Sequence, residues 1–266
     1  MVLTLSPTRE APPSAWRVVE YQLVNARRFW RSIAIVGIFT PLVYVLSLGV
    51  GLGVVVDRHG SQLGVPYLVF VAPAFLTAAA LQIAAGDAAW PVMAGFKWLR
   101  TFHGMAATPL TPTQICDGNL LWLAIRVFVN SALYLAIMAM AGGVRHAGAL
   151  LAVPVATLTG IAFAAPVAAL SATVSAEGQA FNILFRFVVT PMFLFSGTFY
   201  PISQLPGWGR WLAYLSPLWH GTELARGAAI GGLSAVSALG HTAYLLGWLV
   251  VGVGLARWRF RVRLTV

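Results

Sequence analysis

The stretch FSGTFYPISQLP, from Phe195 to Pro206, follows directly on a long apolar run. Two prolines, one glycine and two serines fall within these twelve residues, and each proline removes a backbone donor and breaks a regular helix. A second segment rich in tryptophan and proline, GWGRWLAYLSPLWHG, comes after it. A membrane span that ends in such a broken element predicts non-helical backbone at membrane depth, which survives only where protein or a wet cavity covers it.

The composition of the whole chain places it in a membrane. Of its 266 residues, 59% are hydrophobic and only 9% are charged, which leaves too little polar surface for a water-soluble globule of this size. The single cysteine, Cys116, excludes an intrachain disulfide and a cysteine-based metal cluster. The basic residues that give the formal net charge of +10 lie mainly next to apolar spans. This distribution is explained better by membrane topology than by a nucleic-acid partner.

Six apolar runs are long enough to cross a bilayer, which requires about twenty helical residues. We therefore predict an all-α polytopic membrane protein with six transmembrane helices, folded as a single domain over residues 1–266. Within it, 1–32 forms a cytoplasmic interfacial helix, 33–256 the six-span bundle and 257–266 a basic cytoplasmic tail. The six predicted spans are 33–56, 66–86, 115–141, 149–172, 181–200 and 234–256.

The distribution of lysine and arginine predicts the orientation of these spans. With a cytoplasmic N-terminus, eleven cations fall in inside segments and four in outside segments. The positive-inside rule then predicts that both termini are cytoplasmic, in a multi-pass protein of the cytoplasmic (inner) membrane. The N-terminal residues lack the order of a signal peptide, so no cleavage is expected.

Before the first span, SAWRVVEYQLVNARRFWRS (Ser14 to Ser32) separates apolar and charged residues onto two helical faces. Trp16, Val19 and Leu23 lie on the apolar face, and Arg17 and Glu20 on the charged one. The pattern predicts an interfacial helix held at headgroup depth. A contact with a soluble partner is an alternative that is compatible with it.

The longest inside segment runs from Gly86 to Gly118. Its middle, MAGFKWLRTFHGMA, can form a short amphipathic helix, which Pro109 and Pro112 would stop before the third span. Such a helix could carry force from a cytoplasmic partner. Composition alone leaves open whether it does so or forms a tethered surface loop.

Several kinds of chemistry find no support in the sequence. A phosphate loop needs Gly-Lys-Ser/Thr, whereas the one lysine, Lys97, follows Phe96. His220 and Glu223 share one helical face, but two ligands are too few for a metal, so we expect a polar cap on an interfacial helix there. The seven acidic residues are all expected at span ends or in loops, which argues against proton coupling: Glu10, Glu20, Asp57, Asp87, Asp117, Glu177 and Glu223.

Two arginines fall inside predicted spans, where a guanidinium costs at least ~3 kcal/mol at mid-bilayer. Arg126 lies near the cytoplasmic end of its span and could extend to the inner headgroups. The alternative is a contact with an anionic substrate or a second subunit. The same two alternatives hold for Arg186, whose span ends soon afterwards at Gly197.

Two segments together resemble those of a known family. GMAATPLTPTQICDGNL resembles the ATPL-type cytoplasmic segment of the ABC-2 family of ABC transporter permeases. MFLFSGTFYPISQLPGWGRWLAYLSPLWHGTELARG is similar to that family's best-known stretch, with its FSG, YP, QLP and P-L-x-H elements. With six apolar runs and an amphipathic N-terminal helix, the resemblance covers essentially the whole chain. It is closest to the nodulation-factor and drug-export branch.

The resemblance implies a division of labour between chains. A cytoplasmic ABC ATP-binding subunit, in two copies, would bind ATP and Mg, while this chain would carry no cofactor and form a permease dimer, expected to be a homodimer. A coupling helix would contact the ATPase through residues of the inside loop: Lys97, Arg100, Phe102, Thr108, Pro109 and Leu110. A re-entrant outer-leaflet helical hairpin between spans five and six would form an outer gate with Phe195, Gly197, Tyr200, Pro201, Pro206 and Trp208.

We therefore predict a transport subunit, not an enzyme. It would serve an ATP-driven exporter that moves an amphiphile, such as a lipid-linked glycan, a lipooligosaccharide or a hydrophobic drug, and its other partners would be membrane lipids. An ion-coupled secondary transporter is the first alternative, disfavoured by the expected lack of membrane acids. A lipid-modifying membrane enzyme is the second, disfavoured by the lack of clustered acid, base or metal-ligating residues.

Overall fold

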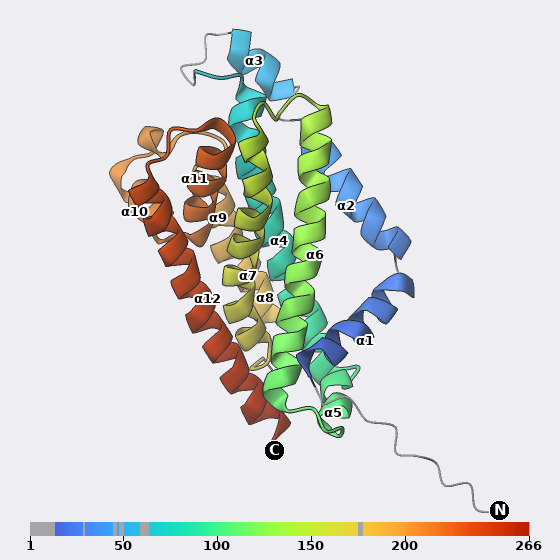
Figure 1. Cartoon of the computed structure of the whole chain (residues 1–266). Coiled ribbons are helices and arrows are strands. Elements are labelled where there is room, and N and C mark those ends of the chain that lie inside the picture. Colours follow the sequence, from blue (N-terminus) through green and yellow to red (C-terminus); the bar gives the residue numbers. More distant parts are fainter. Residues whose placement is uncertain are drawn as a thin grey trace, which may run out of the picture.

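The computed structural model describes residues 14–28, 30–44, 47, 51–58, 64–174 and 178–265, and every long regular element among them is a helix (Figure 1). Two short 3-10 helices, Ala147–Leu151 and Ile202–Gln204, and a π-helical turn, Phe185–Val189, complete the set. The α-helices are α1 (Ala15–Arg28), α2 (Trp30–Tyr44), α3 (Gly53–Arg58), α4 (Tyr67–Lys97), α5 (Thr101–Ala106), α6 (Pro112–Met140), α7 (Ala152–Ser171), α8 (Gln179–Leu184), α9 (Thr190–Phe195), α10 (Gly207–Leu215), α11 (Pro217–Ile230) and α12 (Ala235–Leu264).

Within the described ranges, four stretches are long and apolar enough to cross a membrane: α4, α6, Ala147–Ser171 and α12. They confirm four of the six predicted spans. The predicted fifth span is a shorter apolar segment, Gln179–Phe195, with the π turn between α8 and α9. The predicted first span, 33–56, coincides with α2 and the start of α3, and residues 45–46 and 48–50 between them lie outside the described part.

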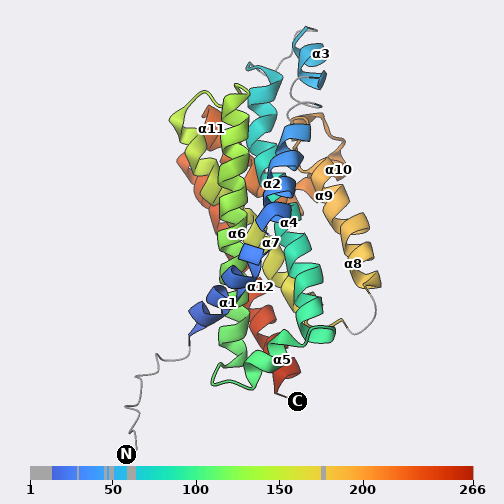
Figure 2. The same ribbon diagram turned by 90° about the vertical axis from the view of Figure 1, so that its right-hand side faces the viewer.

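The helix α4 forms the centre of the bundle. In the most apolar part of α4, 83% of the residues are buried, against 11% in the most apolar part of α12. The helix α12 is therefore peripheral. Small residues let α7 approach α4 closely: a Cβ on Gly160 would lie 3.0 Å from the Ala80 carbonyl oxygen. The Ser171 hydroxyl also donates to the Ala88 carbonyl across the two helices, at 2.8 Å. Figure 2 shows α4 between α7 and the α8–α9 segment.

The helix α4 continues beyond the predicted span, 66–86, to Lys97, so Asp87 lies inside a helix. One prediction about the following segment is wrong. The predicted single helix over MAGFKWLRTFHGMA is divided, because Arg100 adopts left-handed backbone angles with φ 51°. A left-handed residue cannot continue a right-handed helix, so α5 starts in a new direction at Thr101.

The start of α6 follows local rules that the sequence displays. Thr111 accepts a hydrogen bond from the Gln114 backbone N–H, and the Gln114 side chain accepts from the Thr111 N–H, which forms a capping box. Pro112 occupies the first helical position, where its missing N–H has no cost. The predicted stop between the short inside helix and the third span is confirmed.

The amphipathic helix α1 packs on the bundle through one side. Val18 and Val19 are buried, and Val18 and the Ala15 carbonyl approach Gly118 of α6 so closely that a Cβ there would clash with both. Trp16 is 53% exposed, on a side of the helix that no described residue covers. The predicted apolar face is thus divided, because Val19 faces the protein while Trp16 faces away from it.

The bundle has two distinct ends. The helices α1 and α5 and the C-terminal end of α12 lie together at one end, named here the α5 end (Figures 1 and 2). The helices α3 and α10 lie at the opposite end, named here the α10 end.

Candidate functional site

The chain passes from α9 to α10 through residues 195–206, named here the FSG turn. Ser196, Gly197 and Thr198 are buried, and Gly197 has a φ of +71°, which glycine adopts without strain. A Cβ there would also lie 2.9 Å from Cγ2 of Ile202. Pro201 immediately precedes the 3-10 helix, so the chain continues in short pieces instead of one helix.

An arginine clamps the FSG turn to its neighbours. Arg226 Nη2 donates to the Gly197 carbonyl at 2.8 Å, and its Nη1 donates to Glu223 Oε1 at 2.9 Å. The guanidinium also lies 3.9 Å from the ring centroid of Phe70 in α4. Its side chain is only 12% exposed, so the charge is satisfied almost entirely within the protein.

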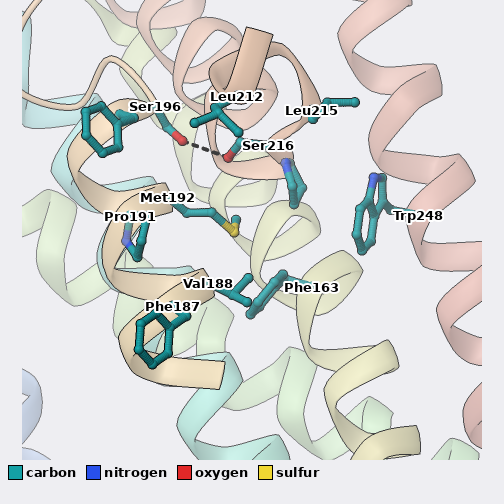
Figure 3. Close-up of a pocket in the computed structure, with 12 residues that line it drawn as sticks. Phe163, Phe187, Val188, Pro191, Met192, Ser196, Leu212, Leu215, Ser216 and Trp248 are labelled. Carbon is teal, nitrogen blue, oxygen red and sulfur yellow. Dashed lines mark hydrogen bonds between the residues drawn. The ribbon is translucent and has the colours of Figure 1, made fainter. Parts of the chain in front are cut away.

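Further hydrogen bonds fix both ends of the turn. The Tyr67 hydroxyl at the start of α4 donates to the Phe199 carbonyl at 3.2 Å. The buried hydroxyls of Ser196 and Ser216 lie 2.7 Å apart, as the dashed line in Figure 3 shows. Ser216 also caps α11 by accepting from the Leu218 N–H at 3.2 Å. The FSG turn is therefore bound to both α4 and α11.

The predicted outer-gate residues lie in this turn or next to it. The Tyr200 hydroxyl donates to the Leu194 carbonyl at 3.2 Å, and the rings of Phe195 and Trp208 are 5.9 Å apart. Pro206 precedes α10, where Trp208 is 62% exposed. The structure thus brings Phe195, Gly197, Tyr200, Pro201, Pro206 and Trp208 together, and their role as a gate stays a prediction.

An apolar pocket of about 250 Å³ lies beside the FSG turn (Figure 3). Helices α7, α9, α10 and α12 supply walls that include Phe163, Met192 and Trp248. Its two polar side chains, Ser196 and Ser216, are hydrogen-bonded to each other. Because a polar ligand would lose its water contacts here without gaining partners, the pocket suits hydrocarbon.

At the α5 end, a cluster of rings holds the short helix α5. Phe102 is 2% exposed, and its ring centroid lies 4.8 Å from that of Phe96 in α4 and 5.4 Å from that of Phe260 in α12. Arg263 covers the Phe96 ring at 4.7 Å. Phe102 therefore faces the bundle, where it can position α5 but cannot itself contact another protein.

The other predicted coupling residues lie nearer the surface. Arg100, Thr108 and Pro109 are exposed, while Lys97 and Leu110 are half-buried. A groove of about 330 Å³ lies between α1 on one side and α5 with its following loop on the other. Because all three line this groove, they form one surface. Its lining includes Arg17, Tyr21, Thr101, Gly104, Thr108 and Leu110.

The two arginines of the predicted spans have different surroundings. Arg126 Nη1 lies 3.0 Å from Asp87 Oδ2, with side chains 30% and 16% exposed, so Arg126 has an internal partner that the sequence analysis did not offer. Arg186 lies in the π turn and is exposed, and it takes part in none of the ion pairs of the described residues. A substrate or intersubunit contact of either arginine stays a prediction.

His220 and Glu223 were expected to form a polar cap on a helix. This prediction is wrong, because Ser216 caps α11. Nδ1 of His220 lies 2.8 Å from Nδ1 of His241, and its Nε2 lies 3.0 Å from the Tyr214 carbonyl oxygen. Glu223 pairs with Arg226. Among the described residues, no three metal-ligating side chains come together.

Three residues that organise the site were missed at the sequence level. Arg226 was counted as an outside-loop cation, Asp87 was expected at a span end, and Tyr67 carried no prediction. The Glu-x-x-Arg spacing of Glu223 and Arg226 signals a helical ion pair. No sequence signal connects Arg226 with Phe70, which is 156 positions away.

An apolar helical bundle with a clamped turn at one end and an open helical surface at the other has the organisation of a polytopic membrane transport protein. Residues 14–230 match the family model of the ABC-2 type transporter, and the chain belongs to that family.

Curated relatives agree with this assignment. The chain is 32% identical over 234 residues to Nodulation protein J of Sinorhizobium fredii, covering 84% of this chain and 87% of that protein. It is 29% identical over 207 residues to Nodulation protein J of Rhizobium meliloti, with 76% and 77% covered. To Nodulation protein J of Rhizobium leguminosarum bv. viciae it is 30% identical over 209 residues, with 76% and 78% covered.

Proposed function

We propose that this chain is the permease subunit of an ATP-driven exporter that moves an amphiphile across the cytoplasmic membrane. The observation that carries the proposal is the position of α5. It belongs to a surface shared with α1, and Phe102 anchors it to α4 and α12. Force applied to that surface would therefore reach two of the membrane-crossing helices directly.

The family implies association with an ABC ATP-binding subunit. We infer that two copies of this subunit bind a permease dimer at the α5 end, which is then cytoplasmic. The cations at that end support this orientation by the positive-inside rule: Lys97, Arg100, Arg257, Arg259, Arg261 and Arg263. The chain lacks a phosphate loop, so ATP and Mg would be held by the partner.

The central helix offers a mechanical route between the two ends. At the α5 end, α4 contacts α5 through Phe96 and Phe102. At the α10 end, Tyr67 and Phe70 of the same helix bind the FSG turn and its clamp, Arg226. With 31 residues and about 1.5 Å of rise per residue, α4 is one continuous helix between these contacts, with Pro73 and Pro91 inside it. Closure of the ATPases would then move α5 and shift the FSG turn.

The apolar pocket beside the FSG turn supports an amphiphilic cargo. Its lining suits a hydrocarbon chain or an apolar ring system. A lipid-linked glycan, a lipooligosaccharide and a hydrophobic drug each carry such a part.

Co-expression with a candidate ATP-binding chain tests the proposal. We expect the two chains to co-purify, and the Arg100→Glu, Thr108→Arg double variant to lose the partner while inserting normally, because both positions are exposed on the proposed docking surface. Arg145→Glu, exposed in the loop that joins α6 to the 3-10 helix before α7, is the matched control and should retain the partner. Robust ATP hydrolysis by the purified chain alone would contradict the proposal.

One observation favours the alternative of ion-coupled transport. Asp87 is a largely buried carboxylate within α4, where none was expected. Arg126 at 3.0 Å neutralises it, however, and a proton carrier must be free to gain and lose its proton. Substrate movement in vesicles that depends on a proton gradient and requires no ATPase would support this alternative.

A further inference from the structure

A polar cavity of about 270 Å³ lies at the contact of α1 with α4 and α6. It is named here the α1 cavity. The helix α1 contributes two amides and α4 one carboxylate, while α6 contributes side chains spaced three and four positions apart, which places them on one face. The polar and aromatic lining residues are Gln22, Asn25, Asp87, Asn119, Trp122 and Arg126.

Several buried polar atoms at this cavity have no hydrogen-bond partner among the described residues. Asn119 is 5% exposed, and its Oδ1 accepts from Gln22 Nε2 at 3.4 Å, but its Nδ2 donates to no described residue. Nε of Arg126 is likewise unpartnered, and Asp87 Oδ2, although close to Nη1 of Arg126, is not aligned for a hydrogen bond. Buried polar groups are usually hydrogen-bonded, and the three residues that carry these atoms line one cavity, so together they support a ligand site.

The unpartnered atoms define the hydrogen bonds that this ligand must make. Asn119 Nδ2 and Arg126 Nε need acceptors, whereas Asp87 Oδ2 needs a donor. A hydroxyl group donates and accepts at the same oxygen, so a molecule with several hydroxyls can satisfy both kinds. The Trp122 indole adds a flat apolar surface on which the C–H face of a ring could pack.

The charges of the cavity select against ionic ligands. Asp87 and Arg126 compensate each other at 3.0 Å, and the remaining polar lining residues are neutral amides. An anion would have to compete with Asp87 for the guanidinium, and a cation would compete with Arg126 for the carboxylate. A neutral ligand leaves the pair intact.

We propose that the α1 cavity binds the neutral, hydroxyl-bearing head group of an amphiphile, one sugar ring in size, while its hydrocarbon chain stays in the bilayer. The volume is just below the usual range of small-molecule pockets, about 300–1,000 Å³, which limits the site to a small head group. The amphipathic helix α1, whose Trp16 is exposed, places the cavity at the membrane surface. Only the identification of this ligand as cargo rests on the proposed function, because binding itself requires no ATPase.

Ligand binding to the purified full chain in lipid nanodiscs tests this site. The probes are n-octyl β-glucoside below its micellar concentration, free glucose and n-octyl sulfate, and the readout is the Kd from thermophoresis. We expect the glucoside to bind more tightly than either other probe. If free glucose binds as tightly as the glucoside, the hydrocarbon chain of the ligand has no role in binding. If n-octyl sulfate binds as tightly, the site does not prefer a neutral head group.

Two variants remove hydrogen bonds and one exchanges the ligand preference. Asn119→Leu should weaken glucoside binding by about tenfold, as expected for a lost hydrogen bond of about 1.4 kcal/mol. Gln22→Leu, on the surface helix, removes the amide that donates to Asn119 Oδ1 and should also weaken binding, because Asn119 loses its support. Asp87→Asn leaves Arg126 without its carboxylate, so this variant should lose affinity for the glucoside and gain affinity for the sulfate. A gain of binding cannot result from misfolding.

Ser131→Ala is the matched control, because Ser131 is also a buried residue of α6 with an unpartnered polar atom but lies outside the cavity. Its glucoside affinity should equal that of the unmodified chain. Unchanged glucoside affinity in Asn119→Leu and Gln22→Leu would overturn the site. Failure of the ATPase to co-purify would instead contradict the proposed function and leave the measured binding unaffected.

Discussion

The FSG turn and the helix α5 are held in place by different kinds of contact. At the α10 end, directional hydrogen bonds from Tyr67, Ser216 and Arg226 fix the FSG turn. At the α5 end, packed rings around Phe102 hold α5. A hydrogen bond weakens steeply when its geometry changes, whereas ring contacts tolerate sliding. The comparison indicates that the FSG turn moves together with α4 through hydrogen bonds, whereas α5 is joined to α4 by ring packing.

The largest effect is expected from removing the clamp of the FSG turn. Arg226→Met leaves Glu223 and the Gly197 carbonyl without their partner, and breaking a buried ion pair in this way costs about 3–5 kcal/mol. Equilibrium unfolding in mixed micelles should show this loss. Arg210→Met is the control, because Arg210 also donates to backbone carbonyls but is exposed. Equal stability of the two variants would mean that the buried clamp holds the FSG turn no more strongly than an exposed arginine does.

Truncating the ring that anchors α5 should cost somewhat less. Phe102→Ala leaves a cavity between α4, α5 and α12, with an expected loss of about 3 kcal/mol. Transport per ATP hydrolysed, measured in proteoliposomes with the partner ATPase, should fall because α5 loses its hold on α4. Phe128→Ala, at a position 48% exposed in α6, should leave both quantities unchanged. Full coupling in the Phe102 variant would show that α5 acts without this ring cluster.

A smaller effect is expected from one added methyl group in the FSG turn. Gly197→Ala forces a residue with a Cβ to a φ of +71°, which costs about 1–2 kcal/mol, and places the new carbon 2.9 Å from Ile202. The midpoint of thermal unfolding should therefore fall. Gly207→Ala is the matched control, because no atom lies within 4 Å of a Cβ there. Equal midpoints for the two variants would mean that the turn is more compliant than its contacts indicate.

The smallest effect is expected from the ion pair between α6 and α12 at the α5 end. Arg257 donates to both Asp117 oxygens, at 2.7 and 2.9 Å, but the side chains are 47% and 31% exposed. Solvent screening limits such a pair to roughly 1 kcal/mol or less. A double-mutant cycle of Asp117→Asn and Arg257→Gln should give a coupling energy in this range. A much larger value would mean that ionic contacts, as well as rings, hold the α5 end.

Local sequence rules predicted elements whose causes are local. The stop before the third span and the break at Pro201 each depend on residues within a few positions. The full length of α4 was not predicted, because a hydropathy window ends at the charged Asp87, whereas Arg126 from another helix compensates that charge. A pattern along one chain cannot display a partner contributed by a distant segment.

The residues of the candidate site show the same difference between local and distant causes. The sequence placed the FSG turn and its glycine correctly, since glycine and proline act on their own backbone. It could not show that Phe102 faces inward, because the direction of a residue in a six-residue helix depends on what covers it. The clamp by Arg226 joins three segments, and only the folded structure brings them together.

The π turn between α8 and α9 gives this segment an adjustable length. A π turn contains one residue more per hydrogen-bonded ring than an α turn, and here the Thr190 hydroxyl also donates to the Phe185 carbonyl at 2.8 Å. Converting it to α geometry would rotate α8 by about 100° against α9 and shift it by about 1.5 Å along their common axis. Such a screw motion would carry the exposed Arg186 from one side of the segment to another. The FSG turn, bound to α4 and α11, could meanwhile stay in place.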